Sequence, residues 1–134
     1  MNLEITAKFN DYELSCFEWM VVQEWPEVAL PLYTETRPIL AKIGDAVVGG
    51  LSFAEHKHPE KSTTCLWINS LLVLPQYRGQ GLGSALVAAA MKTVSSADEL
   101  FVFTNVPGLY QKLLWEVVKS DASESVLRFV GRST

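Results

Sequence analysis

The stretch from Leu71 to Ser84 reads Leu-Leu-Val-Leu-Pro-Gln-Tyr-Arg-Gly-Gln-Gly-Leu-Gly-Ser and decides how the chain folds. It begins as an apolar run typical of a strand, which Pro75 ends because proline has no backbone N–H to give to a sheet. Three glycines follow at positions 79, 81 and 83, directly before an alanine-rich segment that favours a helix. The stretch therefore predicts a strand, a tight glycine turn and the start of a helix.

This glycine turn has the chemistry of an anion site. The N–H groups in the first turn of a helix lack intrahelical acceptors, and the helix dipole makes that end positive. Arg78 adds a cation beside the turn. The nucleoside-triphosphate loop needs a lysine after its glycines, and the dinucleotide fingerprint needs GxGxxG where this chain has GxGxG. We therefore expect residues 78–84 to cradle a pyrophosphate of another kind.

The rest of the chain alternates strand and helix signals without a linker or a repeat. Asn10 offers an N-cap for a helix that Trp25-Pro26 interrupts, and Gly44-Asp45 is typical of a hairpin turn. Residues 27–37 form either a short helix or a loop, and residues 55–61 a loop. The patterns predict strands at residues 3–9, 39–43, 46–53, 63–74, 100–104, 115–119 and 126–130, and helices at residues 84–94 and 107–114. Residues 1–134 are thus expected to form one mixed α/β domain.

Composition narrows the class of protein. The chain is 49% hydrophobic and 19% charged, which is enough apolar surface for a core, and its net charge of -4 argues against a nucleic-acid binder. No apolar run approaches the roughly 20 residues that cross a bilayer, and residues 1–5 do not resemble a signal peptide. Cys16 and Cys65 are far apart and are expected to be unpaired thiols, although one disulfide between them is possible. We expect a cytoplasmic protein that does not bind a membrane.

The stretch around the glycines closely resembles motif A of the GCN5-related N-acetyltransferase (GNAT) family, V-x-P-x-Y-R-G-x-G-φ-G. The family signature, Arg or Gln followed by x-x-Gly-x-Gly, is matched by Arg78, Gly81 and Gly83. A second segment, from Leu109 to Glu116, is similar to the family's later Y-x-K-L-G-F/W-E motif. The resemblance implies the GNAT fold, a central and mostly antiparallel mixed sheet flanked by helices, and acetyl-CoA as cosubstrate.

The same resemblance implies roles for individual residues. Tyr110 matches the tyrosine that protonates the departing thiolate as general acid, with a core tyrosine as the alternative. Asn105 is carried over as a coenzyme contact, although it lies closer to Tyr110 than is usual. Leu114 stands where the family has glycine, which would make that turn less tight. The backbone of Leu71, Leu72 and Val73 would bind the pantetheine arm, and the pyrophosphate contacts would come from Arg78, Gly79, Gln80, Gly81, Leu82, Gly83 and Ser84.

The general base is not determined by the sequence. The family often has a carboxylate on the strand before motif A, but residues 64–70 contain none. Asn69 or Ser70 could hold a water that relays the proton, or Glu55 or His56 could act directly. The amine could also arrive already deprotonated. These options stay open.

The acceptor is expected to be a small molecule with a primary amine, such as a polyamine, an aminoglycoside or an amino-acid-like amine, which attacks the thioester directly. The alternatives are acetylation of a protein lysine or N-terminus, and a non-catalytic sensor of acetyl-CoA. The family builds its acceptor pocket in a region that here holds Trp19, Glu24, Trp25, Glu27, Tyr33 and Glu35, and these side chains would suit a cationic amine. A packed helix with a charged outer face is the alternative, and the sequence favours it slightly.

Two further expectations concern metals and assembly. His56 and His58 lie in the segment interpreted as a solvated loop, and no further ligand accompanies them, so we expect no metal site. Homodimers are common in the family, so a homodimer is possible.

Overall fold

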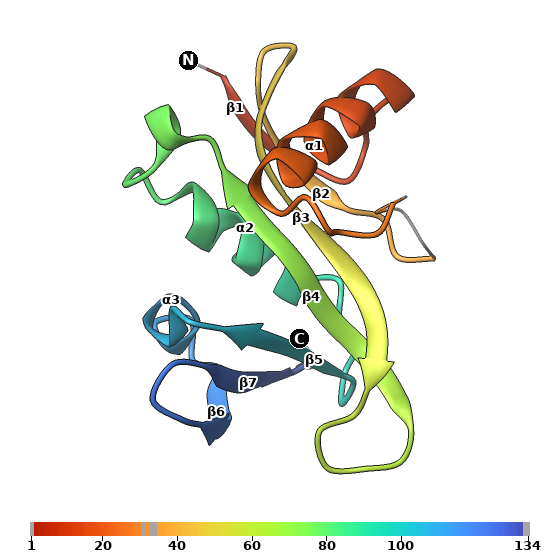
Figure 1. Cartoon of the computed structure of the whole chain (residues 1–134), viewed down its shortest axis with the longest axis vertical. Coiled ribbons are helices and arrows are strands. Elements are labelled where there is room, and N and C mark those ends of the chain that lie inside the picture. Colours follow the sequence, from red (N-terminus) through yellow and green to blue (C-terminus); the bar gives the residue numbers. More distant parts are fainter. Residues whose placement is uncertain (1, 31, 33–34, 133–134) are drawn as a thin grey trace.

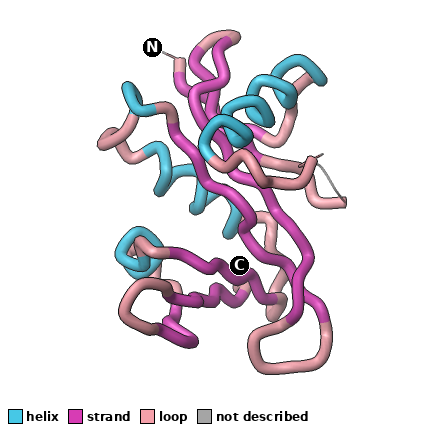
Figure 2. The backbone as a smooth tube through the Cα atoms, viewed as in Figure 1, coloured by secondary structure: helices cyan, strands magenta, loops and turns pink. Residues whose placement is uncertain are grey.

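The computed structural model describes residues 2–30, 32 and 35–132, which form a seven-stranded sheet with helices on both faces (Figures 1 and 2). The strand order is β1-β2-β3-β4-β5-β7-β6, and β4 and β5 are the parallel pair. The expected mixed, mostly antiparallel α/β architecture is therefore confirmed. The elements are β1 (Leu3–Thr6), α1 (Asp11–Glu24), β2 (Ile39–Ile43), β3 (Ala46–Lys57), β4 (Thr64–Val73), a 3-10 turn (Pro75–Tyr77), α2 (Leu82–Met91), β5 (Glu99–Thr104), α3 (Pro107–Gln111), β6 (Glu116–Ser120) and β7 (Ser125–Val130).

Helix α1 begins where the sequence predicts. The side chain of Asn10 accepts a hydrogen bond from the N–H of Glu13 at 2.8 Å, and the Glu13 carboxylate accepts one from the N–H of Asn10 at 3.0 Å. This capping box satisfies two N–H groups that would otherwise lack partners. The Glu13 carboxylate also pairs with Lys42 of β2, and the hydrogen bond from Lys42 is the main cause that lowers the pKa of Glu13. The start of α1 is thereby fixed to the sheet.

Each face of the sheet has its own apolar core. Alternate residues of a strand point to opposite faces, so Leu40 packs beneath α1 while its neighbours Ile39 and Ala41 pack beneath α2. Phe17 of α1 lies so close to β3 that a Cβ on Gly50 would stand 2.6 Å from its ring, and that position therefore needs glycine. The α1 core consists of Phe17, Met20, Val21, Leu32, Leu40 and Leu72, and α2 contributes Leu82, Leu86, Val87 and Ala90 to the other core.

Strand β3 is longer than the sequence predicts, and this corrects the interpretation of residues 55–61 as a loop. Glu55, His56 and Lys57 pair with residues of β4, and only residues 58–63 connect the two strands. At the other end of the sheet, β1 stops at Thr6 instead of continuing to Phe9. Both differences arise because strand pairing, rather than local composition, sets where a strand ends. The described part of residues 27–37 contains no helix, which agrees with the loop that was one of the two expectations.

The segment 55–60 is also not a solvated loop throughout, because His58 is buried and 3% exposed. Its Nε2 lies 2.8 Å from a carboxylate oxygen of Glu99 at the start of β5, and its hydrogen bond lowers the pKa of Glu99. Arg128 of β7 pairs with Glu99, with Glu60 of the connection and with Glu116 of β6. This ionic cluster joins the β3–β4 connection to the three C-terminal strands.

Three smaller findings complete the description. Cys16 and Cys65 are free thiols, as expected. Within the described residues, no helix is long and apolar enough to cross a bilayer. The same residues contain no group of three or more His, Cys, Asp and Glu side chains placed to hold a metal ion.

Candidate active site

The site lies where β4 separates from β5. The two strands pair only from Leu66 to Ile68 on β4, opposite residues 100–102, and β4 then diverges toward the glycine turn (Figure 1). The pairing of β4 with β3 skips Asn69, since Ser70 stands opposite Ser52 and Ile68 opposite Phe53. Beyond this bulge, none of the described strands pairs with the β5-facing side of β4. The expected opening of the sheet along Leu71, Leu72 and Val73 is present, and the Val73 carbonyl there accepts a hydrogen bond from the Arg78 side chain.

The glycine turn takes the conformation that its sequence indicates. Gly79 and Gly81 have φ angles of +80° and +84°, a left-handed region that residues with a Cβ rarely adopt. Gly81 is the N-cap of α2. The first backbone hydrogen bond of the helix is the one that the N–H of Ala85 donates to the Gly81 carbonyl at 3.0 Å. The N–H groups of residues 82–84 are thus left for an anion. Arg78 is tied to the end of β4 through its Nε, which donates to the Val73 carbonyl at 2.8 Å.

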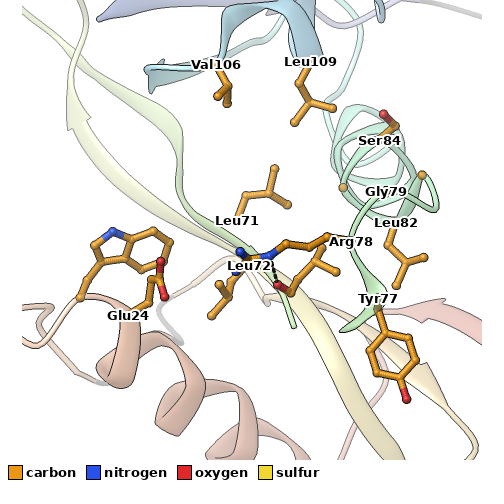
Figure 3. Close-up of a pocket in the computed structure, with 14 residues that line it drawn as sticks. Glu24, Leu71, Leu72, Tyr77, Arg78, Gly79, Leu82, Ser84, Val106 and Leu109 are labelled. Atoms are coloured by element: carbon orange, nitrogen blue, oxygen red, sulfur yellow. Dashed lines mark hydrogen bonds between the residues drawn. The ribbon is translucent and has the colours of Figure 1, made fainter. Parts of the chain in front are cut away.

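A cleft of about 530 Å³ joins the glycine turn to the diverging strand (Figure 3). Nine of the predicted cofactor-binding residues line it: Leu71, Leu72, Val73, Arg78, Gly79, Gly81, Leu82, Gly83 and Ser84. Gln80 and Asn105, which were also predicted, do not line this cleft. Its remaining walls come from Glu24, Trp25, Tyr77, Val106 and Leu109, and Figure 3 shows Val106 and Leu109 facing Leu71 across the opening.

A second pocket of about 310 Å³ continues between β4 and β5. It shares Trp25, Leu71 and Val106 with the cleft, so the two spaces adjoin. Its other lining residues are Ile68, Asn69, Ser70, Val102, Phe103, Thr104, Asn105, Tyr110 and Glu124. The structure therefore brings the predicted acid Tyr110 together with Asn69 and Ser70, and it places Asn105 here instead of in the larger cleft.

Tyr110 is held firmly at the wall of this pocket. Helix α3 presents it, its carbonyl accepts the N–H of Trp115 at 3.1 Å, and the two rings meet edge to face at 5.2 Å between centroids. The side chain is 2% exposed, and burial raises the pKa of Tyr110 to about 12. The phenol is therefore protonated at neutral pH and is able to donate a hydrogen bond.

The candidates for the base are placed very differently. Glu55 and His56 lie on the far half of β3, opposite Leu66 and Cys65, and line neither the cleft nor the pocket. Ser70 is buried and shares a hydrogen bond with Ser52, whereas Asn69 at the bulge is exposed. Of the candidates named from the sequence, only Asn69 and Ser70 lie at the site.

One carboxylate in the pocket was not predicted. Glu124 lies in the turn between β6 and β7, and nothing in its local sequence distinguishes it from a residue of an ordinary solvated turn. The expected acceptor cluster is only partly assembled. Glu24 and Trp25 reach the site, but Trp19, Glu27 and Glu35 line neither space, and Tyr33 lies outside the described residues.

The geometry fits coenzyme A. Its diphosphate needs N–H donors and a cation, which residues 82–84 and Arg78 supply, and its amide-rich arm needs unpaired backbone groups, which β4 supplies. A Cβ on Gly79 or Gly81 would meet nothing within 4 Å, so both glycines stand beside open space where a ligand has room.

Comparison with solved structures defines the fold as that of GNAT acetyltransferases. The chain is similar to Arabidopsis thaliana NAA60 in complex with a bisubstrate analogue, with a TM-score of 0.71 and 12% identity over 99% of this chain and 100% of that one. It is also similar to Bacillus subtilis N-acetyltransferase YlbP in complex with coenzyme A, with a TM-score of 0.57 and 20% identity over 96% and 95%. A putative phosphinothricin N-acetyltransferase aligns with a TM-score of 0.68 and 15% identity over 98% and 100%.

The sequence itself places the chain in a family. Residues 6–114 match the model of the acetyltransferase (GNAT) family, which covers most of the chain, whereas a search of curated protein sequences found no match. The chain therefore belongs to the GNAT family and is an acetyl-CoA-dependent N-acetyltransferase.

Proposed function

We propose that this enzyme acetylates a primary amine of a small molecule. One observation carries the proposal: the opening between β4 and β5 connects the glycine-turn cleft to a compact pocket that contains Tyr110. The cleft suits the coenzyme, and the pocket begins where the arm of the coenzyme would end. The reacting carbonyl would then lie near Leu71, which lines both spaces.

The chain's own groups have distinct tasks in this reaction. Acetyl-CoA supplies an activated acetyl group when bound. The N–H groups of residues 82–84 and Arg78 hold its diphosphate, and the free edge of β4 aligns its arm. A backbone N–H at the free edge of β4 near Leu71 would polarise the thioester oxygen, so that negative charge developing there would meet a fixed donor. Since the amine attacks the carbonyl directly, no cysteine nucleophile is required.

Tyr110 assists the departure of sulfur by donating a hydrogen bond. Its pKa of about 12 lies above that of an ordinary thiol, about 8.5, so complete transfer of the phenolic proton to a thiolate is unfavourable in the ligand-free site. A hydrogen bond to the developing thiolate still stabilises it without that transfer. We expect Tyr110→Phe to lower kcat more than it raises the KM for acetyl-CoA.

The size of the pocket favours a small acceptor. Ligand pockets range from about 300 to 1,000 Å³, and at about 310 Å³ this pocket lies at the lower end of that range. A peptide or protein acceptor would extend beyond this pocket. Acetylation of peptides in preference to free amines would contradict the proposal.

Two measurements test the proposed function. Calorimetry with coenzyme A and acetyl-CoA should show binding, and Arg78→Met should weaken it without unfolding the protein. Release of free thiol from acetyl-CoA should then depend on an added small amine. No binding of either coenzyme would overturn the assignment of the cleft, and binding without amine-dependent thiol release would indicate a sensor in place of an enzyme.

A further inference from the structure

The charge of the acceptor pocket comes from one side chain. Of the described residues that line the pocket, Glu124 alone carries a formal charge at neutral pH, and the others are apolar, amide, hydroxyl or phenol groups. Among these described residues there is no lysine, arginine or histidine to neutralise it. The net charge of the whole chain is also negative, at -4. The pocket therefore attracts a cation rather than an anion.

The turn that carries Glu124 is fixed by hydrogen bonds. The Asp121 carboxylate accepts the N–H of Ser123 at 2.9 Å and the N–H of Glu124 at 3.0 Å, and the Asp121 N–H donates to the Glu124 carbonyl at 2.9 Å. The hydroxyls of Ser120 and Ser125 meet at 2.9 Å across the strands. Because these bonds fix the backbone of the turn, only the side chain of Glu124 has to become ordered when it binds a ligand.

An indole completes the chemistry of a cation site. Trp25, just beyond the C-terminus of α1, lines the pocket together with Glu124 and is 40% exposed. The face of an indole ring attracts ammonium ions, most strongly where water is excluded. The pocket thus combines one carboxylate with three aromatic side chains, those of Trp25, Phe103 and Tyr110.

We infer that Glu124 determines acceptor specificity by binding the amine as an ammonium ion, and that the acceptors are basic primary amines. The inference rests on the proposed function. A basic amine with a pKa like that of lysine, about 10.4, is almost entirely cationic at neutral pH, and the carboxylate binds that form. Before attack the bound ammonium loses one proton to water. The neutral nitrogen then bonds to the thioester carbon, the carbon–sulfur bond breaks, and the second proton of the amine leaves with the thiolate as free coenzyme A. A weakly basic arylamine, which is neutral at this pH, gains nothing from Glu124 and leaves the carboxylate without a partner.

The test compares Glu124→Gln with the wild-type protein on two acceptors of similar size, benzylamine, which is cationic at neutral pH, and aniline, which is neutral. Loss of a charge-assisted hydrogen bond should raise the KM for benzylamine roughly ten- to a hundred-fold. The KM for acetyl-CoA and the low activity with aniline should not change. Glu4→Gln is the matched control, because Glu4 is an exposed carboxylate of β1 that lines neither space.

A positioning variant separates the role of the carboxylate from that of the turn. Asp121→Ala removes the acceptor of two backbone hydrogen bonds but keeps Glu124, so it should raise the KM for benzylamine less than Glu124→Gln does and leave kcat nearly unchanged. Equal kinetics of Glu124→Gln and wild type, or a wild-type preference for aniline, would overturn the inference while leaving the proposed function intact. Failure of the wild-type protein to bind coenzyme A would instead overturn the proposed function.

Discussion

The Oγ atoms of Ser52 and Ser70 lie 2.5 Å apart, buried, at the bulge where β4 turns away from β5. Either hydroxyl can be the donor, and neither is exposed to bulk water. The pair holds β3 to β4 at the point where β4 loses its other neighbour. The hydrogen bond with Ser52 also occupies the Ser70 hydroxyl. Of the two residues proposed to hold a relay water, Asn69 and Ser70, Asn69 is therefore the more accessible.

This pair predicts a coupled effect on stability. Ser52→Ala leaves the Ser70 hydroxyl buried without a partner and should lower the free energy of unfolding by about 1–3 kcal/mol. The double variant Ser52→Ala with Ser70→Ala should lose clearly less than the sum of the two single variants, because no orphaned hydroxyl remains. Urea unfolding of all four proteins measures the coupling, and strict additivity would contradict it.

Two glycines allow the effect of the glycine turn on coenzyme binding to be separated from its effect on stability. Gly81 in the glycine turn and Gly44 in the β2–β3 turn both have positive φ, and a Cβ on either would meet nothing within 4 Å. Alanine at either position should therefore destabilise the fold by a similar amount, about 1 kcal/mol. Only Gly81→Ala should weaken coenzyme A, roughly tenfold or more, because the N–H groups of the turn would shift. Calorimetry on both variants checks this, and equal coenzyme affinity would mean that the turn does not bind the diphosphate.

The features that the sequence predicted correctly have local causes. The N-cap at Asn10, the hairpin turn at Gly44 and the glycines after Pro75 each depend on a few neighbouring residues, so their patterns are readable without a structure. The length of β3 and the burial of His58 depend on β4, on Glu99 and on the Arg128 cluster, which are distant in sequence.

The candidate site divides in the same way. The cleft at the glycine turn follows from one continuous motif, and nine of the residues named from the sequence line it, whereas Gln80 and Asn105 do not. The acceptor half of the site combines α1, β4, β5, α3 and the β6–β7 turn, so the presence of Glu124 could not be inferred from its neighbours. The cytoplasmic location and the homodimer stay predictions from the sequence.

Leu114 shows what happens when the sequence departs from the family pattern. Its φ is +68°, so the leucine adopts the left-handed conformation that glycine would adopt more easily, and the expected loosening of the turn does not occur. The side chain is 74% exposed, so it gains little burial in return. Leu114→Gly should raise the free energy of unfolding by about 0.5–1 kcal/mol. The gain is the strain relieved at the positive φ, reduced by the greater entropy that glycine has in the unfolded chain.

Leu114→Ala is the matched control for that change. It removes the exposed side chain but keeps the Cβ that causes the strain, so it should not gain stability. Thermal unfolding of the two variants distinguishes them. A gain with alanine equal to that with glycine would assign the effect to the apolar side chain and not to the backbone.

The buried phenol of Tyr110 should make stability fall at alkaline pH. Burial raises the pKa of Tyr110 from the ordinary 10.0 to about 12, so between these values the folded protein keeps a proton that the unfolded chain releases. The contribution of this proton to the free energy of unfolding is complete below pH 10 and is lost as the pH rises toward 12. At pH 11, one unit above the pKa in the unfolded chain, the loss is about 1 kcal/mol. Tyr110→Phe has no such proton, so the difference in free energy of unfolding between wild type and Tyr110→Phe should shift against the wild type from pH 10 upward. Urea unfolding at a series of alkaline pH values measures this difference, and parallel curves for the two proteins would show that the phenol is not buried as described.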